Sequence, residues 1–350
     1  DVVSAAYGGK PFLFGADYLI PKPFDPRLIT EIPPAVARAA METGVATRPI
    51  TDFDAYVEKL SQTVFKSGLV MKPVFERANA DLQRVVLAEG NSDRVLNATQ
   101  ILIDDCLCYP VLLGNREGIA RRIKRLGLRM KEGEGFEILD PRDNPNMDRH
   151  IAEYLKVMGR RGVSPAFARS VVQNQTTVLA ALLVRCGDAD TLLCGAQGAY
   201  RTHLNHMRDI IGVRDNVSEC SSVDLLILNT GTVFLTDTHV TVDPSADEVA
   251  ETAVMAAHLV ERFGMVPKVA LLSSSNFGSM DSPAALKMRE ARELLTQSHP
   301  ELNVDGEMHA DAALSQEIRD RVYPNAAFEG SANVLVMPSL DAANITFKTV

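Results

Sequence analysis

The sequence has no tryptophan, and only 6% of its 350 residues are aromatic. It also has no apolar run near the about 20 residues that a membrane-spanning helix requires, so we expect a soluble protein without a membrane segment. Basic residues are in deficit, with 36 Lys and Arg against 45 Asp and Glu and a formal net charge of -9. This deficit argues against nucleic acid or an acidic lipid surface as a partner, and an anionic small ligand would need a locally basic cleft.

Cysteine is also scarce. The five cysteines are odd in number and lie in apolar surroundings: Cys106, Cys108, Cys186, Cys194 and Cys220. Reduced thiols in a cytoplasmic protein explain this better than a disulfide framework. Cys106 and Cys108 are two apart on a predicted helix and would point to different faces, which makes them a poor metal pair. The chain starts at Asp1 without Met and both ends look cut, so the lack of a signal peptide carries little information.

The first region, residues 1–65, is rich in proline and differs from the rest of the chain. A helix is expected over 33–43, with prolines in its first turn, where the missing N–H costs nothing. Gly44 should end it. A second helix is expected over 52–66, and the pattern then loosens into a linker over 63–72.

Residues 72–216 and 217–350 alternate apolar strand patterns with amphipathic helical patterns. Such alternation with short links predicts α/β lobes with mostly parallel sheets flanked by helices. One antiparallel hairpin is expected in the second lobe, between Val223–Asn229 and Val233–Val242. A helix capped by Ser245 should follow it.

The most informative stretch is VALLSSSNFGS, an apolar strand pattern that ends in small polar residues and precedes a helical pattern. Ligands bind at such strand ends in open α/β sheets. Hydroxyl, amide and backbone N–H groups there suit phosphate or amide oxygens, and they come from Ser273, Ser274, Ser275, Asn276, Gly278 and Ser279. The alternative is an ordinary turn between a strand and a helix.

A second strand end follows the apolar run Thr191–Cys194. Gly195 and Gly198 would let a ligand approach the backbone there, although two glycines at this spacing are weak evidence. The helix that follows carries His203 and His206 one turn apart, but no nearby Cys or carboxylate completes a metal site. Three arginines are the preferred phosphate partners, because guanidinium groups match phosphate and the chain is otherwise acidic: Arg201, Arg208 and Arg214. Exposed helix arginines without a ligand are the alternative.

A third group of polar residues stands at a predicted strand end and helix start: Asp305, Glu307, His309 and Asp311. Carboxylates and a histidine together could perform acid–base chemistry. Equally, Asp311 could only cap a helix.

Two segments near the start resemble the end of the catalytic part of bacterial multidomain NADP-dependent malic enzymes: IPKPFDPRL (Ile20–Leu28) and AVARAAMETGVATRPI (Ala35–Ile50). The resemblance implies that the family's catalytic tyrosine and lysine, its ligands for a divalent metal (Mg or Mn) and its NADP-binding loop lie upstream of this chain. We therefore do not expect this chain alone to oxidise malate.

Residues 72–350 resemble the phosphotransacetylase family through separated blocks in the same order: EGNSDRVL (Glu89–Leu96), LCGA (Leu193–Ala196), PKVALLSSSNFGS (Pro267–Ser279), DGEMHADAA (Asp305–Ala313) and NVLVMPSLDAANITFK (Asn333–Lys348). The resemblance implies two lobes of the isocitrate/isopropylmalate dehydrogenase-like kind, with coenzyme A and acetyl phosphate bound between them. It also implies self-association as a dimer, or a higher oligomer. The family's C-terminal return to the first lobe, with its catalytic arginine and aspartate, would fall beyond Val350.

The departures from the family pattern are equally informative. Active members carry a histidine, serines and an arginine after the glycine-alanine of the cleft strand, where this chain has Gly198, Ala199, Tyr200 and Asn205. Met158 replaces a further arginine. Loss of one preorganised donor typically costs about 2.7–4 kcal/mol in the reaction barrier, so the resemblance implies a coenzyme A cleft without its chemistry.

We therefore expect the acetyl-CoA-binding, catalytically silent regulatory domain of an NADP-dependent malic enzyme, with no catalytic residue and no metal site in this chain. The residues expected to contact acetyl-CoA are Gly195, Gly198, Tyr200, Arg201, Asn205, Arg208, Arg214, Ser273, Ser274, Ser275, Asn276, Gly278, Ser279 and Asn344. Two alternatives remain: an active phosphate acetyltransferase, which makes acetyl phosphate and CoA from acetyl-CoA and phosphate, and a module that only mediates oligomerisation.

Overall fold

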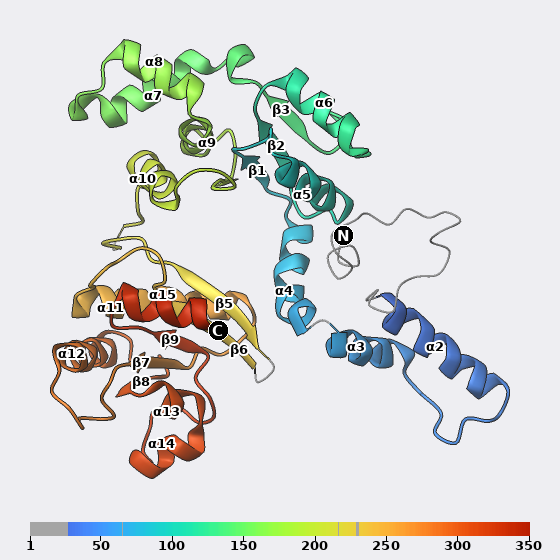
Figure 1. The fold of residues 1–350 in the computed structure, drawn as a ribbon, viewed down its shortest axis with the longest axis vertical. Coiled ribbons are helices and arrows are strands. Elements are labelled where there is room, and N and C mark those ends of the chain that lie inside the picture. The colour runs from blue at the N-terminus through green and yellow to red at the C-terminus, as the bar shows by residue number, and fades with distance from the viewer. Residues whose placement is uncertain (1–26, 65, 216, 229–230) are drawn as a thin grey trace. The chain divides into compact units, whose positions relative to one another are not determined.

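The structure is a computed structural model that describes residues 27–64, 66–215, 217–228 and 231–350 (Figure 1). The chain forms two compact units that divide between Pro73 and Val74. Residues 1–26, which include most of the first malic-enzyme-like segment, lie outside the described residues.

The first unit contains helices α2 (Arg27–Glu42) and α3 (Phe53–Val64), which pack against each other. The prediction that prolines open the first helix is wrong, because α2 begins at Arg27 and holds Pro33 and Pro34 in its interior. The segment before the prolines, RLITEI, has no glycine or proline, so nothing in it stops a helix. Gly44 ends the helix as predicted, with a left-handed φ of +74°.

The linker expected over residues 63–72 is mostly helical, since helix α4 (Lys66–Ala80) occupies most of it, and the two compact units divide just after it. Gly68 and Pro73 lie within this helix, and both residue types usually interrupt helices, so the sequence did not predict it. Cys106 is likewise not helical: α5 ends at Asp104, and Cys106 has a positive φ of 51°.

The first sheet of the second unit has four parallel strands in the order β3-β2-β1-β4. Alternate residues of β1 and β2 face opposite sides, as a strand's period of two requires. Val86 and Val111 pack against α7 to α10, whereas Leu87 and Leu112 pack against α5 and α6. The strands are β1 (Arg84–Leu87), β2 (Tyr109–Leu113), β3 (Glu137–Leu139) and β4 (Thr191–Leu193).

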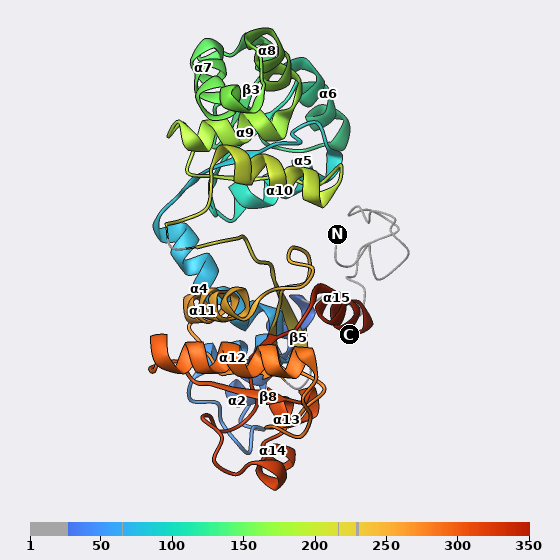
Figure 2. The ribbon, with the colours of Figure 1, turned by 90° about the vertical axis from the view of Figure 1, so that its left-hand side faces the viewer.

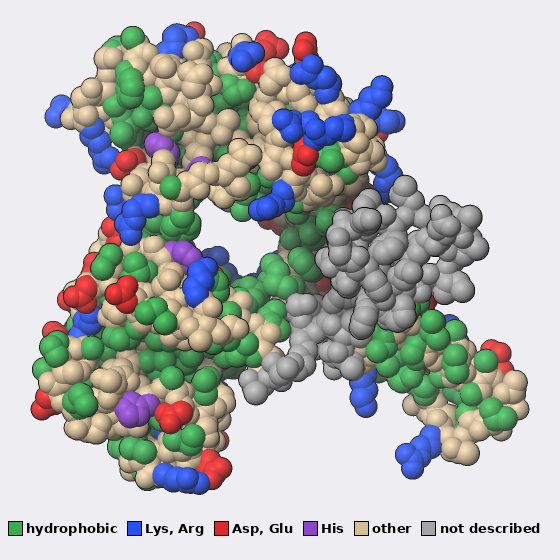
Figure 3. All heavy atoms as spheres, viewed as in Figure 1, with side chains coloured by type: hydrophobic (Ala, Val, Ile, Leu, Met, Phe, Trp, Pro, Cys, Tyr) green, Lys and Arg blue, Asp and Glu red, His purple; other side chains and the backbone are tan. Residues whose placement is uncertain are grey.

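Helices on both faces make this sheet doubly wound, with α5 (Asp93–Asp104), α6 (Arg116–Leu126), α7 (Met147–Met158), α8 (Pro165–Asn174), α9 (Thr176–Arg185) and α10 (Tyr200–Ile210), and the short 3-10 helices η1 (Pro141–Asp143) and η2 (Gly159–Arg161). Figure 3 shows basic side chains gathered over α6 on the face in view. Arg122 and Arg125 there pair with Asp93 on α5 at 3.1 and 2.5 Å, as an ordinary solvated helix surface would.

The second sheet has five strands in the order β5-β6-β9-β7-β8. Its strands are β5 (Val223–Leu228), β6 (Gly231–Thr236), β7 (Val269–Leu272), β8 (Val304–Met308) and β9 (Val334–Val336). The predicted hairpin is confirmed: β5 pairs antiparallel with β6, and all other pairs are parallel. Its helices are α11 (Ala246–Arg262), α12 (Pro283–Ser298), α13 (Ala310–Leu314), α14 (Gln316–Val322) and α15 (Leu340–Thr349).

Helices α11 and α12 lie side by side on one face of this sheet (Figure 2). Their alanines and leucines pack on Phe234, Val269 and Leu271. The opposite face of the strands, with Leu235, Ala270 and Leu335, packs on α13 and α15. Since β6, β7, β8 and β9 are parallel, their carboxyl ends share one edge of the sheet, where ligands bind in such folds.

The α/β class with mostly parallel sheets flanked by helices is thus confirmed. No helix in the described part of the chain is long and apolar enough to cross a membrane.

Candidate ligand site

The Gly195–Gly198 turn lies where the strand order of the first sheet reverses. The chain runs outward from β1 to β2 and β3 and then returns to β4 on the other side of β1. Ligands of doubly wound sheets bind outside the strand ends at such a reversal. Here the Gly195 N–H donates to Glu89 Oε1 at 2.8 Å, which joins the ends of β4 and β1.

Gly198 is required by its neighbour His203. Its φ is +96°, and a Cβ there would lie 2.8 Å from His203 Nε2. His203 holds the turn from both ring nitrogens, because Nε2 lies 2.7 Å from Gln197 O and Nδ1 lies 2.8 Å from Thr177 Oγ1. The carbonyl can only accept, so Nε2 carries the proton and Nδ1 accepts from the hydroxyl. His203 is therefore a structural group of the turn.

Tyr200 and Arg201 begin α10 and reach the loop that follows β6 in the second sheet. Arg201 Nη2 donates to Val240 O at 2.9 Å, and the rings of Tyr200 and His239 are 5.3 Å apart. Asn344, near the start of α15, donates to Thr238 O in the same loop at 3.1 Å. Three predicted contact residues thus converge on one loop, from segments far apart in the sequence.

The sequence pattern did not predict that loop, residues 237–241, because its apolar residues extended the predicted strand to Val242. In the structure β6 ends at Thr236, and the prediction of a longer strand is wrong. Asp237 is 8% exposed and organises the loop by accepting from Ser222 Oγ at 2.6 Å and from the Thr241 N–H at 2.8 Å. The available signal was the polar triplet that follows the apolar residues of β6, the same pattern that marks the serine loop.

The serine loop, residues 273–279, follows β7 as predicted. Most of its polar groups already have partners within the protein. Ser275 Oγ donates to Glu307 Oε1 at 2.7 Å, and the Gly278 N–H donates to the same oxygen at 2.9 Å. Ser273 Oγ accepts from the Ser275 N–H at 2.8 Å, and Ser279 Oγ accepts from the Asn276 N–H at 2.9 Å. Ser274 is exposed, and among the described residues its side chain has no hydrogen bond.

Asp305 and Glu307 lie inside β8 and not at its end, and both are buried. Glu307 pairs with Arg289 Nε at 3.0 Å. Burial alone would raise the pKa of Glu307, but the hydrogen bonds from Arg289, Ser275 and the Gly278 N–H outweigh burial and hold this pKa below its ordinary value. Asp305 accepts from the Ala327 N–H at 2.7 Å. Both carboxylates therefore anchor loops within the protein, and acid–base chemistry by them stays a prediction.

His309 precedes α13, and its backbone N–H donates to Asn276 Oδ1 at 2.7 Å. Asp311 Oδ1 accepts only from the adjacent Ala312 N–H at 2.8 Å within the described residues, which fits the helix-start alternative. No group of three or more His, Cys, Asp or Glu side chains that could hold a metal ion occurs in the described ranges.

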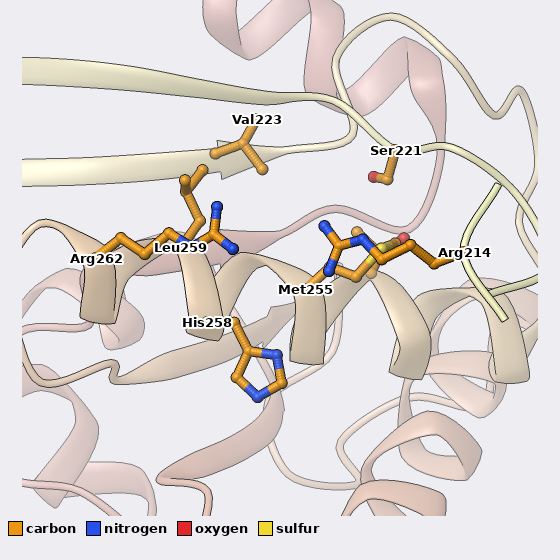
Figure 4. Close-up of a pocket in the computed structure, with 8 residues that line it drawn as sticks. Arg214, Ser221, Val223, Met255, His258, Leu259 and Arg262 are labelled. Atoms are coloured by element: carbon orange, nitrogen blue, oxygen red, sulfur yellow. The ribbon is translucent and has the colours of Figure 1, made fainter. Parts of the chain in front are cut away.

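The remaining residues predicted to contact acetyl-CoA do not contact the 237–241 loop. Arg208 pairs with Glu219 at 3.0 Å, so a ligand phosphate would have to compete with that carboxylate. Arg214 lines a pocket on the flank of α11 (Figure 4). Asn205 is half-buried on α10, without a side-chain hydrogen bond to any described residue.

Comparisons with known proteins agree on the family. Residues 69–350 match the family described as phosphate acetyl/butaryl transferase. An NAD-dependent malic enzyme of Rhizobium meliloti is 50% identical over 351 residues, which are 100% of this chain and 46% of that protein. An NADP-dependent malic enzyme of Haemophilus influenzae is 50% identical over 347 residues, 99% of this chain and 46% of that protein. The chain therefore spans about half the length of these relatives.

Among solved structures, a phosphotransacetylase from Streptococcus pyogenes superposes with a TM-score of 0.74 at 29% identity, covering 81% of this chain and 85% of that one. The likeness to malic enzymes runs through the whole chain, whereas the likeness to transacetylases covers its α/β part. The chain thus corresponds to the part of the malic enzymes that carries a phosphotransacetylase-like domain, and it belongs to the phosphate acetyl/butaryl transferase family.

Proposed function

We propose that this chain is an acetyl-CoA-binding regulatory domain, catalytically silent, of a cytoplasmic malic enzyme that oxidatively decarboxylates malate to pyruvate. Its likeness to malic enzymes over its full length supports the parent activity. The catalytic residues, the NADP site and the divalent metal (Mg or Mn) would belong to the rest of such a protein. Acetyl-CoA would act as an effector, and self-association through this domain would couple the subunits.

One observation carries the silent-site proposal: the charged and titratable side chains around the Gly195–Arg201 turn already form hydrogen bonds within the protein. Glu89 accepts from the Gly195 N–H, His203 bridges Thr177 and Gln197, and Arg201 donates to Val240 O. An acyl-transfer site needs a donor aimed at the developing negative charge. Backbone N–H groups and neutral side chains can still bind a large ligand that contacts many groups.

The replaced family positions point the same way. Gly198, Ala199 and Tyr200 supply no base and no cation at the turn. Met158 ends α7, and its near neighbour Arg161 pairs with Asp209 at 2.6 Å. Each lost donor typically costs about 2.7–4 kcal/mol in the barrier, so a site that lacks several should turn over at a negligible rate.

Regulation follows if acetyl-CoA binds one arrangement of this domain more tightly than another. Tyr200 and Arg201 on α10 and Asn344 on α15 contact the loop at 237–241, so a ligand at these residues would change how tightly the two helices hold that loop. A ligand that binds one of two arrangements more tightly increases the population of that arrangement. The coupling between two binding sites is reciprocal, so each ligand changes the affinity for the other. Acetyl-CoA should therefore alter malate binding in the intact polypeptide.

An active phosphate acetyltransferase is the second candidate, because the matching family is named for that reaction. The deciding experiment mixes the purified chain with acetyl phosphate and CoA and follows the thioester absorbance, with an active phosphotransacetylase as positive control. We expect no rate above background. A robust rate would establish the transferase and end the silent-site proposal.

A second experiment separates regulation from a purely oligomeric scaffold. Titration calorimetry with acetyl-CoA should give a saturable signal, and Tyr200→Ala should weaken it. Arg169→Ala is the matched control, since Arg169 lies on α8 and pairs with Asp148. Absence of heat and of a thermal shift at millimolar acetyl-CoA would leave only the scaffold.

A further inference from the structure

The pocket that Arg214 lines, here called the flank pocket, lies beside the second sheet, between α11 and the start of the edge strand β5 (Figure 4). Its volume is about 270 Å³. Pockets for drug-sized ligands measure roughly 300–1,000 Å³, so this one suits a small group. The residues that line it are Arg214, Ser221, Val223, Thr252, Met255, His258, Leu259 and Arg262. Of these, only Arg214 belongs to the set predicted to contact acetyl-CoA.

Two arginines enter the pocket from opposite ends. Figure 4 shows Arg214, from the segment after α10, and Arg262, in the last turn of α11, extending toward each other, while His258 points away. Neither guanidinium has an ion-pair partner among the described residues. Two like charges that face each other without a carboxylate repel, and a bound anion would remove this repulsion.

The nearby carboxylates are occupied elsewhere. Glu219 pairs with Arg208 at 3.0 Å, and Glu251 on α11 accepts from the Ser218 N–H at 3.0 Å. Neither carboxylate forms an ion pair with Arg214 or Arg262, in a chain whose formal net charge is -9.

The pocket also contains an unpaired hydroxyl. Ser221 Oγ is buried and has no hydrogen-bond partner among the described residues. Such a buried group without a partner costs free energy, and a ligand oxygen would supply the missing bond. Thr252 offers a second hydroxyl along the wall. Guanidinium groups and hydroxyls together match the tetrahedral oxygens of phosphate better than one planar carboxylate.

We propose that this pocket binds a phosphoryl group, free or as a small phosphomonoester, between Arg214 and Arg262 with Ser221 as a further donor. It is separate from the proposed acetyl-CoA site, because its walls are the side of α11 and the edge strand, not the 237–241 loop or the Gly195–Gly198 turn. The proposal does not depend on the silent-site assignment, and either one can fail alone.

The experiment titrates the full chain at low ionic strength, in a buffer free of phosphate and chloride, with inorganic phosphate, glycerol 3-phosphate and succinate in separate runs. Calorimetry should show saturable binding of phosphate or of the phosphomonoester, and weaker binding of succinate. Arg214→Gln, Arg262→Gln and Ser221→Ala should each weaken this binding at least tenfold. Arg321→Gln, which removes an exposed arginine paired with Glu317 on α14, should leave the affinity within twofold of wild type.

Two readouts guard against trivial outcomes. Circular dichroism and the urea midpoint of each variant must match wild type, and the two arginines are exposed, so their replacement should not unfold the protein. Preloading with acetyl-CoA should leave the phosphate affinity unchanged. The proposal is overturned if neither phosphate nor the phosphomonoester binds at 10 mM, a dissociation constant that corresponds to roughly 2.7 kcal/mol. It is also overturned if the Arg214 and Arg262 variants bind phosphate as wild type does, or if succinate binds as tightly as phosphate. Displacement of phosphate by acetyl-CoA would overturn it as well.

Discussion

At the scale of single residues, this domain keeps its loops in place with a few buried or half-buried polar side chains. Glu307 anchors the serine loop, Asp237 anchors the loop after β6, and His203 anchors the Gly195–Gly198 turn. Each group satisfies several donors or acceptors at once, so its loss leaves more than one buried polar group unpaired. Residues that looked chemical in the sequence thus serve the shape of the site.

Glu307→Gln should destabilise the chain by about 2–3 kcal/mol. The figure is below the about 3–5 kcal/mol for breaking a fully buried pair, because Arg289 keeps a second partner. That partner is Asp281, at 2.7 Å from Arg289. Urea unfolding measures the loss, and Glu317→Gln, in an exposed pair on α14, is the matched control with an expected change within about 0.5 kcal/mol. Equal effects of the two substitutions would refute the anchoring role.

The same carboxylate predicts a pH dependence. The pKa of folded Glu307 lies below its ordinary value of 4.5, because hydrogen bonds outweigh burial. The unfolded state then binds the proton more readily, so the stabilisation is complete above the ordinary value and is lost as the pH falls through the folded pKa. The stability difference between wild type and Glu307→Gln should therefore shrink as urea titrations move from pH 7 to pH 3. A difference that grows on acidification contradicts this assignment.

Gly198→Ala should lower the free energy of unfolding more than Gly212→Ala does. Both glycines have positive φ, +96° and +91°, so both substitutions pay about 1–2 kcal/mol of backbone strain. Only at Gly198 would the new methyl meet another atom, His203 Nε2 at 2.8 Å. The displaced imidazole would lose its bond to Gln197 O, which adds about 0.5–1.5 kcal/mol. Thermal unfolding of both variants measures the difference, and equal costs would mean that His203 moves freely.

At the scale of elements, the positions of the helices depend on their first residues. Ser245 forms a capping box with Glu248: its Oγ accepts from the Glu248 N–H at 3.2 Å, and Glu248 Oε2 accepts from the Ser245 N–H at 2.7 Å. This box starts α11, and three residues separate it from the 237–241 loop. It therefore positions the helix that forms one wall of the flank pocket.

Ser245→Ala should destabilise the chain by about 1 kcal/mol, as the loss of a helix cap usually does. Ser92 provides the control, since it precedes α5 as its N-cap but makes no side-chain capping bond. Ser92→Ala should change the stability by less than about 0.5 kcal/mol. Guanidinium unfolding distinguishes the two, and a larger loss at Ser92 would contradict the capping account.

At the scale of the whole molecule, the proposed acetyl-CoA site depends on contacts between elements that no local sequence pattern connects. Arg201 and Tyr200 on α10 belong to the first sheet's helices, yet they contact Val240 and His239 after β6. The strand order of each sheet brings the carboxyl ends of separate strands to one edge. A ligand at these residues would contact elements that belong to both sheets, which would be the physical basis of the proposed effector role.

Arg201→Ala should weaken acetyl-CoA binding by roughly tenfold, because a charged hydrogen bond that holds the 237–241 loop contributes about 1.5–3 kcal/mol. Calorimetry with acetyl-CoA measures this loss. Arg169→Ala, which breaks the exposed pair with Asp148, should leave the affinity unchanged. Wild-type affinity in Arg201→Ala would remove this loop from the proposed site.

The sequence alone was enough to predict the alternation of strands and helices, the hairpin, the cap at Ser245 and the serine loop after a buried strand, because these depend on periodicity and on turn and cap chemistry within about ten residues. The local pattern failed to predict the helices that contain proline, α2 and α4. Only the tertiary structure decided which polar residues meet: it brought Glu307 to Ser275 and His203 to Thr177, and it placed Arg214 opposite Arg262. Those partners are set by strand order and helix packing, which join residues that lie far apart along the chain.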